Sequence, residues 1–170
     1  MDQTLTSGEF SVMAKNIKSA APGDKTKLFS MQEGFGDITD NRFRFTGEKR
    51  GSSYPNPGTV TFRIITGNAE TRVFDGSKGI INFDTTRWYF WQFVWSTGTA
   101  RLTVRQDGPN GPVIYNSQVG TGSRDYAPTP HVAYLGAPAG RNGPIDATAP
   151  RIIFKNVWLS RNPRPAFPGE

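Results

Sequence analysis

Apolar and polar residues alternate along most of the chain, in short segments bounded by Gly, Pro, Asn and Asp. A period of two is typical of strands that bury one face. Turn-forming pairs such as Asp107-Gly108 and Asn110-Gly111 separate several of these segments. Only residues 13–21 are compatible with a helix, and the first of them fit a strand equally well. The predicted strands are Glu9–Lys15, Lys27–Gln32, Asn41–Phe45, Thr59–Ile65, Arg72–Phe74, Ile80–Phe83, Trp88–Trp95, Arg101–Gln106, Val113–Gln118, His131–Leu135 and Ile152–Leu159.

Three predicted strands place apolar side chains on one face and arginine on the other. The arginines of these strands are Arg42, Arg44, Arg63, Arg101 and Arg105. Like charges on neighbouring strands destabilise a sheet, so we predict that this arginine face binds an anionic ligand. The alternative is that intervening strands separate the arginines and acidic loops neutralise them. The predicted core comprises Phe43, Phe45, Phe62, Ile64, Tyr89, Trp91, Phe93, Leu102, Val104, Val157 and Leu159.

Two predicted strands are apolar on both faces. The segment Trp88–Trp95 is interrupted only by Gln92, which indicates a central strand. Gln92 is either a hydrogen-bonded core residue or a ligand-binding residue, because an unpaired buried amide is costly. In the last strand, a bulge near Lys155 would place Phe154, Val157 and Leu159 together. Trp158 would then lie in a second small core or be exposed to a ligand.

Length and composition restrict the classes of protein. The 170 residues suit one domain, with residues 1–160 forming a sandwich and 161–170 a terminal strap or the start of a linker. The absence of cysteine excludes disulfides and thiolate metal sites, and the single histidine, His131, excludes multi-histidine metal centres. The net charge of +6, with arginine supplying 13 of 20 cations, suits an anionic partner.

The order of several motifs resembles one family. Gly8–Lys15 followed by Leu28–Met31, then Trp88–Phe93 with the hairpin Leu102-Thr103-Val104-Arg105-Gln106-Asp107-Gly108, and finally Val132–Gly136 and Ile153–Ser160, resemble the laminin-G-like and concanavalin A-like jelly rolls. The resemblance implies an all-β fold, an antiparallel two-sheet β-sandwich of jelly-roll type with a concave face. Members of this fold include lectins, carbohydrate-binding modules, glucanases and polysaccharide lyases, so function must be argued from the site.

Two functions remain open. Glycoside hydrolysis is disfavoured because no predicted strand carries two acidic residues on one face. A small polysaccharide lyase acting on uronate polymers would use His131, Tyr134, Gln92 and Arg42, although the Gln-x-His and Tyr-x-Lys-x-Gly motifs of jelly-roll alginate lyases are absent. We favour non-catalytic carbohydrate binding, with an acidic polysaccharide or glycan held on aromatic and arginine side chains.

The predicted ligand-binding residues are Arg42, Arg44, Arg63, Gln92, Arg101, Arg105, Tyr134, Asn156 and Trp158. No cofactor is required. Calcium is the one candidate ion, because Asp37 and Asp40 lie in a Gly-rich loop, for which an ordinary Asx-rich turn is the alternative. Nucleic acid is a disfavoured partner, since no oligonucleotide-binding motif is present. No run of 18 apolar residues and no signal peptide occur, so we expect an extracellular or cell-surface module in mature or excised form.

Overall fold

The computed structural model describes residues 7–17, 25–32, 43–50, 60–66, 69–74, 81–120, 132–135 and 152–165. These residues form ten strands in two sheets, and every strand pairing between them is antiparallel. The strands are β1 (Gly8–Lys15), β2 (Lys25–Gln32), β3 (Phe43–Arg50), β4 (Val60–Thr66), β5 (Ala69–Phe74), β6 (Trp88–Ser96), β7 (Thr99–Gln106), β8 (Val113–Gly120), β9 (Val132–Leu135) and β10 (Ile153–Ser160).

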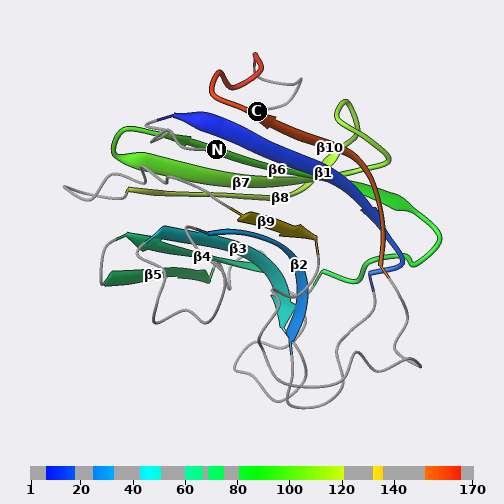
Figure 1. Cartoon of the computed structure of the whole chain (residues 1–170). Coiled ribbons are helices and arrows are strands. Elements are labelled where there is room, and N and C mark those ends of the chain that lie inside the picture. Colours follow the sequence, from blue (N-terminus) through cyan, green and yellow to red (C-terminus); the bar gives the residue numbers. More distant parts are fainter. Residues whose placement is uncertain are drawn as a thin grey trace.

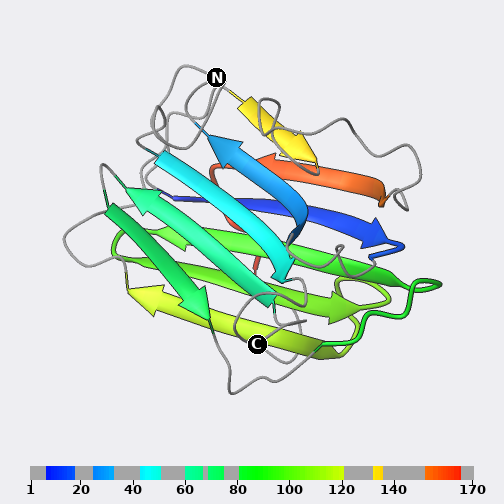
Figure 2. The same ribbon diagram turned by 90° about the horizontal axis from the view of Figure 1, so that it is seen from below.

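The two sheets are stacked in layers (Figure 1). Sheet A has the strand order β10-β1-β6-β7-β8, and sheet B has the order β5-β4-β3-β2-β9. The chain leaves sheet A after β1, builds β2–β5 of sheet B, and returns for β6–β8. It then adds β9 to sheet B and β10 beside β1, so that both late strands lie at sheet edges (Figure 2). This is the predicted all-β, two-sheet jelly-roll sandwich.

Strand β6 is the third of the five strands in sheet A, as its apolar character on both faces predicted. Its two-residue connection to β7 contains Gly98, whose φ of 76° favours glycine. The predicted turn signals at Asp107-Gly108 and Asn110-Gly111 both lie in the β7–β8 connection. A Cβ at Gly111 would lie 1.6 Å from the backbone oxygen of Gln106, so only glycine fits there.

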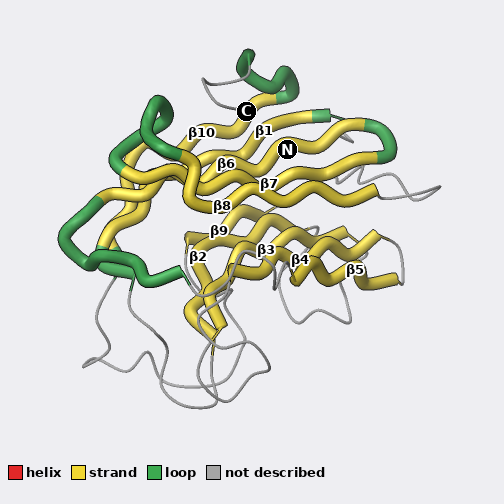
Figure 3. Tube along the Cα trace, turned by 180° about the vertical axis from the view of Figure 1, so that it is seen from behind, coloured by secondary structure: helices red, strands yellow, loops and turns green. Residues whose placement is uncertain are grey.

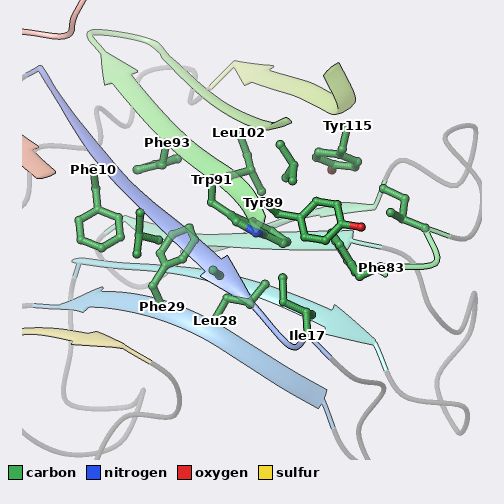
Figure 4. Packing of buried hydrophobic residues seen from close by; sticks show 14 of the residues in the cluster. Phe10, Ile17, Leu28, Phe29, Phe83, Tyr89, Trp91, Phe93, Leu102 and Tyr115 are labelled. Atoms are coloured by element: carbon green, nitrogen blue, oxygen red, sulfur yellow. The ribbon is translucent and has the colours of Figure 1, made fainter. Parts of the chain in front are cut away.

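The core lies between the sheets and is dominated by aromatic rings (Figure 4). Phe10 of sheet A contacts Phe29 of sheet B with ring centroids 5.0 Å apart, and Phe29 also meets the edge of Trp91 at 6.2 Å. The buried, predicted core residues are Tyr89, Trp91, Phe93, Leu102 and Val104. Each fully buried side chain of this size contributes roughly 1.5–3 kcal/mol, which explains why alternation predicted the core-facing residues of β6 and β7.

Several details of the prediction are corrected. Residues 81–84 form no strand: Ile81 and Phe83 reach the core without pairing to a neighbour. Strand β3 continues through Gly47 to Arg50, because β2 and β4 pair with it on both sides. Met13 belongs to a strand and not to a helix. Val157 is 52% exposed, whereas Leu159 packs partly buried against the core.

The side chains of Phe43, Phe45, Phe62 and Ile64 lie outside the described part of the structure. Figure 3 shows that the described loops join strands around the rim of the sandwich. No helix among the described residues is long and apolar enough to cross a membrane.

Candidate functional site

The face of sheet A that points away from sheet B carries most of the buried polar side chains of the described residues. We call it the outer face. Its residues alternate with core residues along β1, β6 and β7, so their positions follow directly from the register. The solvent-inaccessible polar residues of this face are Glu9, Ser11, Gln92, Thr103 and Arg105. Buried polar groups are normally found where a structural anchor or a binding site requires them.

A bulge in β10 determines which side chains join the outer face. Trp158 pairs with Ser11 and Lys155 pairs with Met13, so β10 has one more residue than β1 between these pairs. The bulge contains Asn156, whose φ of 53° is left-handed. Residues three apart in a regular strand point to opposite faces, but the extra residue puts Lys155 and Trp158 on the same face. The bulge predicted near Lys155 is confirmed, and it places Phe154 and Leu159, but not Val157, against the core. The ligand role of Asn156 stays a prediction.

At one end of the outer face, the segment after β10 folds back over β1. Figure 1 shows this red segment on the side of sheet A opposite to sheet B. The backbone N–H and the Nε of Arg164 donate to the two oxygens of Glu9 at 2.8 and 2.9 Å, and Nη2 also donates to Glu9 and to Ser11. The guanidinium carbon lies 5.6 Å from the ring centre of Phe90 and 5.2 Å from that of Trp158. We call these five residues the Arg164 anchor.

The carboxylate of Glu9 is stabilised in its ionised form within this anchor. Burial alone raises the pKa of Glu9, but the hydrogen bonds and the charge of Arg164, with the Ser11 hydroxyl, outweigh burial and hold the pKa below its usual value of 4.5. Glu9 is inaccessible to solvent, while the Arg164 side chain is 32% exposed. A buried carboxylate binds a cation strongly, and in this chain the bound cation is the guanidinium of Arg164.

At the other end of the outer face, two lysines approach one tryptophan. The Nζ of Lys155 lies 4.0 Å from the ring centre of Trp88, and the Nζ of Lys15 lies 5.9 Å from it. Lys15 pairs directly with Trp88 across β1 and β6, and Lys155 comes from β10. Trp88 and Lys15 are half-buried and Lys155 is exposed. We call these three residues the lysine–tryptophan cluster.

Between the two ends, a row of polar side chains crosses the sheet. Ser11, Gln92, Thr103 and Asn116 are successive partners on β1, β6, β7 and β8, and Trp158 precedes Ser11 in the same row. The Oε1 of Gln92 is buried and accepts no hydrogen bond in the structure. The side chain of Trp158 remains 47% exposed at the edge of the sheet. The row therefore has a buried polar centre and an accessible aromatic surface at one edge.

The predicted arginine face is divided between the two sheets. Arg44 lies on β3 and Arg63 on β4 of sheet B, whereas Arg101 and Arg105 lie on β7 of sheet A. Arg105 is buried and its Nη1 donates to the backbone oxygen of Gly111 at 3.1 Å. Arg101 is the half-buried member of this set on the outer face of sheet A. The two pairs of arginines cannot share one sheet face, because their strands belong to different sheets. The alternation that suggested a shared face describes positions within one strand and does not say which sheet the strand joins.

Two residues of the alternative catalytic set, Gln92 and Tyr134, lie on strands of different sheets. Gln92 points away from sheet B, while Tyr134 belongs to β9 of sheet B. Arg42 and His131, and the candidate calcium ligands Asp37 and Asp40, lie outside the described residues. Within the described ranges, no group of three or more His, Asp or Glu residues could hold a metal ion.

Sequence reasoning missed Glu9, Lys15, Trp88, Lys155 and Arg164 as residues of one face. Lys15 is the last residue of one predicted strand and Trp88 is the first residue of another, so alternation could assign the face of each. That the two residues pair could not be predicted, because it depends on which strands are neighbours in the sheet. The bulge hypothesis contained the signal for Lys155, since it shifts that residue relative to Trp158. Only Arg164 carried no periodic signal, because it follows the last strand.

No protein-family model matches the chain, and no curated protein matches it. Among solved structures, it is similar to a heptameric SAP-like pentraxin from Limulus polyphemus, with 14% identity over 79% of this chain and 52% of that chain and a TM-score of 0.41. The binding domain of botulinum neurotoxin DC in complex with SialylT is 12% identical over 78% of this chain and 28% of that chain, with a TM-score of 0.44. The binding domain of botulinum neurotoxin serotype D/C VPI 5993 is 14% identical over 91% and 32%, with a TM-score of 0.41. The chain spans between 28% and 52% of the length of these structures, and the likeness is one of β-sandwich architecture.

Proposed function

We propose that the chain binds an acidic glycan without catalysis, on the outer face of sheet A. The observation that carries the proposal is the pairing of aromatic surface with positive charge on this face. Trp158 is 47% exposed, and Trp88 lies beside the ammonium groups of Lys15 and Lys155, which form no ion pair with a described carboxylate. Sugar rings stack on aromatic faces, and cations attract the acidic groups of the same ligand.

The polar row supports the same function. A glycan that lies across the strands from Trp158 meets the half-buried Asn116 and the exposed Gln118 at the far edge of the sheet, with Arg101 beside them. Ser11, Gln92 and Thr103 are buried, so the contacts lie at Trp158 on one edge of the sheet and near Asn116 on the other. Strands are spaced about 4.8 Å apart, so these two edges of the five-stranded sheet are about 19 Å apart. That length suits a polymer and not a single sugar. We further propose that such a ligand is met outside the cell or at a cell surface.

Trp158→Ala tests the proposal. Binding is measured by calorimetry with alginate, polygalacturonate and heparin, with a neutral glucan for comparison. We expect the acidic polymers to bind and the variant to weaken their binding by about tenfold, from the loss of one aromatic contact. Leu135→Ala is the matched control, because Leu135 is 42% exposed but lies on sheet B.

Two results would overturn this proposal. One is equal affinity for neutral and acidic polymers, or for none. The other is turnover: a rise in the absorbance of an unsaturated sugar product would identify a lyase, in which Gln92 and Tyr134 could not share one site because their strands lie in different sheets.

A further inference from the structure

We propose that Lys15 and Lys155, held at Trp88, form a binding site for an oxyanion. This inference rests on the proposed function, in which the site binds the sulfate or carboxylate group of an acidic glycan. The preference for acidic ligands would then come from these lysines, which were not among the predicted ligand-binding residues. The site lies at the end of β1 opposite to Glu9, six residues away, which is about 20 Å along a strand. It is therefore separate from the Arg164 anchor.

The three residues are placed by backbone geometry. Lys15 faces Trp88 directly across neighbouring strands, and the bulge at Asn156 turns Lys155 onto the same face. Both ammonium nitrogens are within 5.9 Å of one ring centre, so they are less than about 10 Å apart. Two like charges at this separation repel each other at the ionic strengths of ordinary buffers. The sequence and the fold nevertheless bring them together.

No carboxylate among the described residues forms an ion pair with either lysine. The ion pairs among the described residues join Arg87 to Asp84 and Asp107 and Arg164 to Glu9, and neither lysine takes part in one. Asp84 is close enough for the charge of Lys15 to contribute to its lowered pKa. Its Oδ1 already accepts from the N–H and hydroxyl of Thr86, however, and its Oδ2 lies 3.6 Å from Arg87.

An oxyanion is the ligand that completes this arrangement. Each ammonium has three N–H donors, and a sulfate or carboxylate offers several acceptor oxygens. Trp88 fixes Lys155 by a cation–π contact, which lowers the cost of ordering its long side chain when an anion binds. Lys155 is exposed and Lys15 is half-buried, so solvent reaches both side chains.

The experiment titrates inorganic sulfate into the protein labelled with ¹⁵N at its tryptophan indoles, at an ionic strength kept constant with sodium chloride. We expect a saturable shift of the Trp88 indole signal. Trp91 and Trp95 are fully buried and serve as internal references. Sodium acetate replaces sulfate in a second titration, and the tighter of the two anions decides between a sulfate and a carboxylate ligand.

Lys155→Gln and the double variant Lys15→Gln/Lys155→Gln should weaken sulfate binding by about tenfold or more. Arg161→Gln is the matched control, because it removes one cation from an exposed position outside the cluster. Urea unfolding confirms that each variant is folded. The site is overturned if the Trp88 signal does not respond to either anion, or if the double variant and Arg161→Gln respond alike.

The same variants separate this inference from the proposed function. If the wild-type chain binds acidic glycans and the double variant binds them with unchanged affinity and salt dependence, the glycan site is right and the lysine site is wrong. If sulfate shifts Trp88 but no glycan binds, the oxyanion site stands and the glycan proposal fails.

Discussion

The two ends of the outer face of sheet A hold cations beside aromatic rings in opposite ways. In the Arg164 anchor, the guanidinium has a buried carboxylate partner, Glu9. In the lysine–tryptophan cluster, two ammonium groups share one ring and form no ion pair with a described carboxylate. A cation–π contact is present at both ends, so this contact alone does not reveal a role. The presence or absence of a buried counter-charge separates a structural anchor from an open binding site.

The largest effect on stability should come from breaking the Arg164 anchor. Arg164→Ala leaves the carboxylate of Glu9 buried without a counter-charge, and we expect it to lower the free energy of unfolding by about 2–4 kcal/mol. Removing one partner of a fully buried pair costs about 3–5 kcal/mol, and the expected loss is about 1 kcal/mol smaller because the arginine is 32% exposed. Urea denaturation measures the loss.

Adding Glu9→Gln to Arg164→Ala is the control for this change. Since the double variant no longer buries a charge, it should recover part of the lost stability. Equal stability of Arg164→Ala and the wild type would show that the segment after β10 does not anchor the sheet.

The same end should respond to acid. The folded-state pKa of Glu9 is lowered, so its ionisation stabilises the fold at pH values above the unfolded pKa near 4.5, and this contribution is lost as the pH falls through the folded value. Unfolding free energies measured between pH 7 and pH 3 should therefore fall less steeply in Glu9→Gln/Arg164→Ala than in the wild type. Parallel profiles would assign the acid sensitivity to other carboxylates, such as Asp84, whose pKa is also lowered by Thr86 and Arg87.

A change in the β10 bulge should affect both the stability of the fold and anion binding at the lysine–tryptophan cluster. Asn156 has a φ of 53°, which asparagine tolerates and β-branched residues do not. Asn156→Val should lower stability by about 1–2 kcal/mol and also weaken anion binding at Lys155, while Asn156→Gly should preserve both. Unfolding and sulfate titration measure the two effects. Loss of stability without any change at Trp88 would separate the bulge from the cluster.

The sequence predicted the parts of this molecule that local periodicity determines. The faces of β6 and β7, the core role of Trp91 and Val104, and the bulge near Lys155 all follow from alternation within one strand. The arginine face failed because alternation does not say which sheet a strand joins, and β3 and β7 belong to different sheets. The Arg164 anchor joins residues 155 positions apart, a contact that no local pattern encodes.

The smallest effect on stability should come from changing the lysine–tryptophan cluster. Lys15→Gln/Lys155→Gln removes two cation–π contacts, each worth about 0.5–1 kcal/mol at an exposed site, but it also removes the repulsion between the two ammonium groups. Because these effects oppose each other, the unfolding free energy should change by less than about 0.5 kcal/mol. The expected change in anion affinity, tenfold or more, is much larger than the expected change in stability. A stability loss above about 1 kcal/mol would show that the lysines stabilise the fold, like Arg164, and would contradict their role as a binding site. Stability equal to or above that of the wild type, with weakened anion binding, would show that the fold tolerates this repulsion where a ligand relieves it.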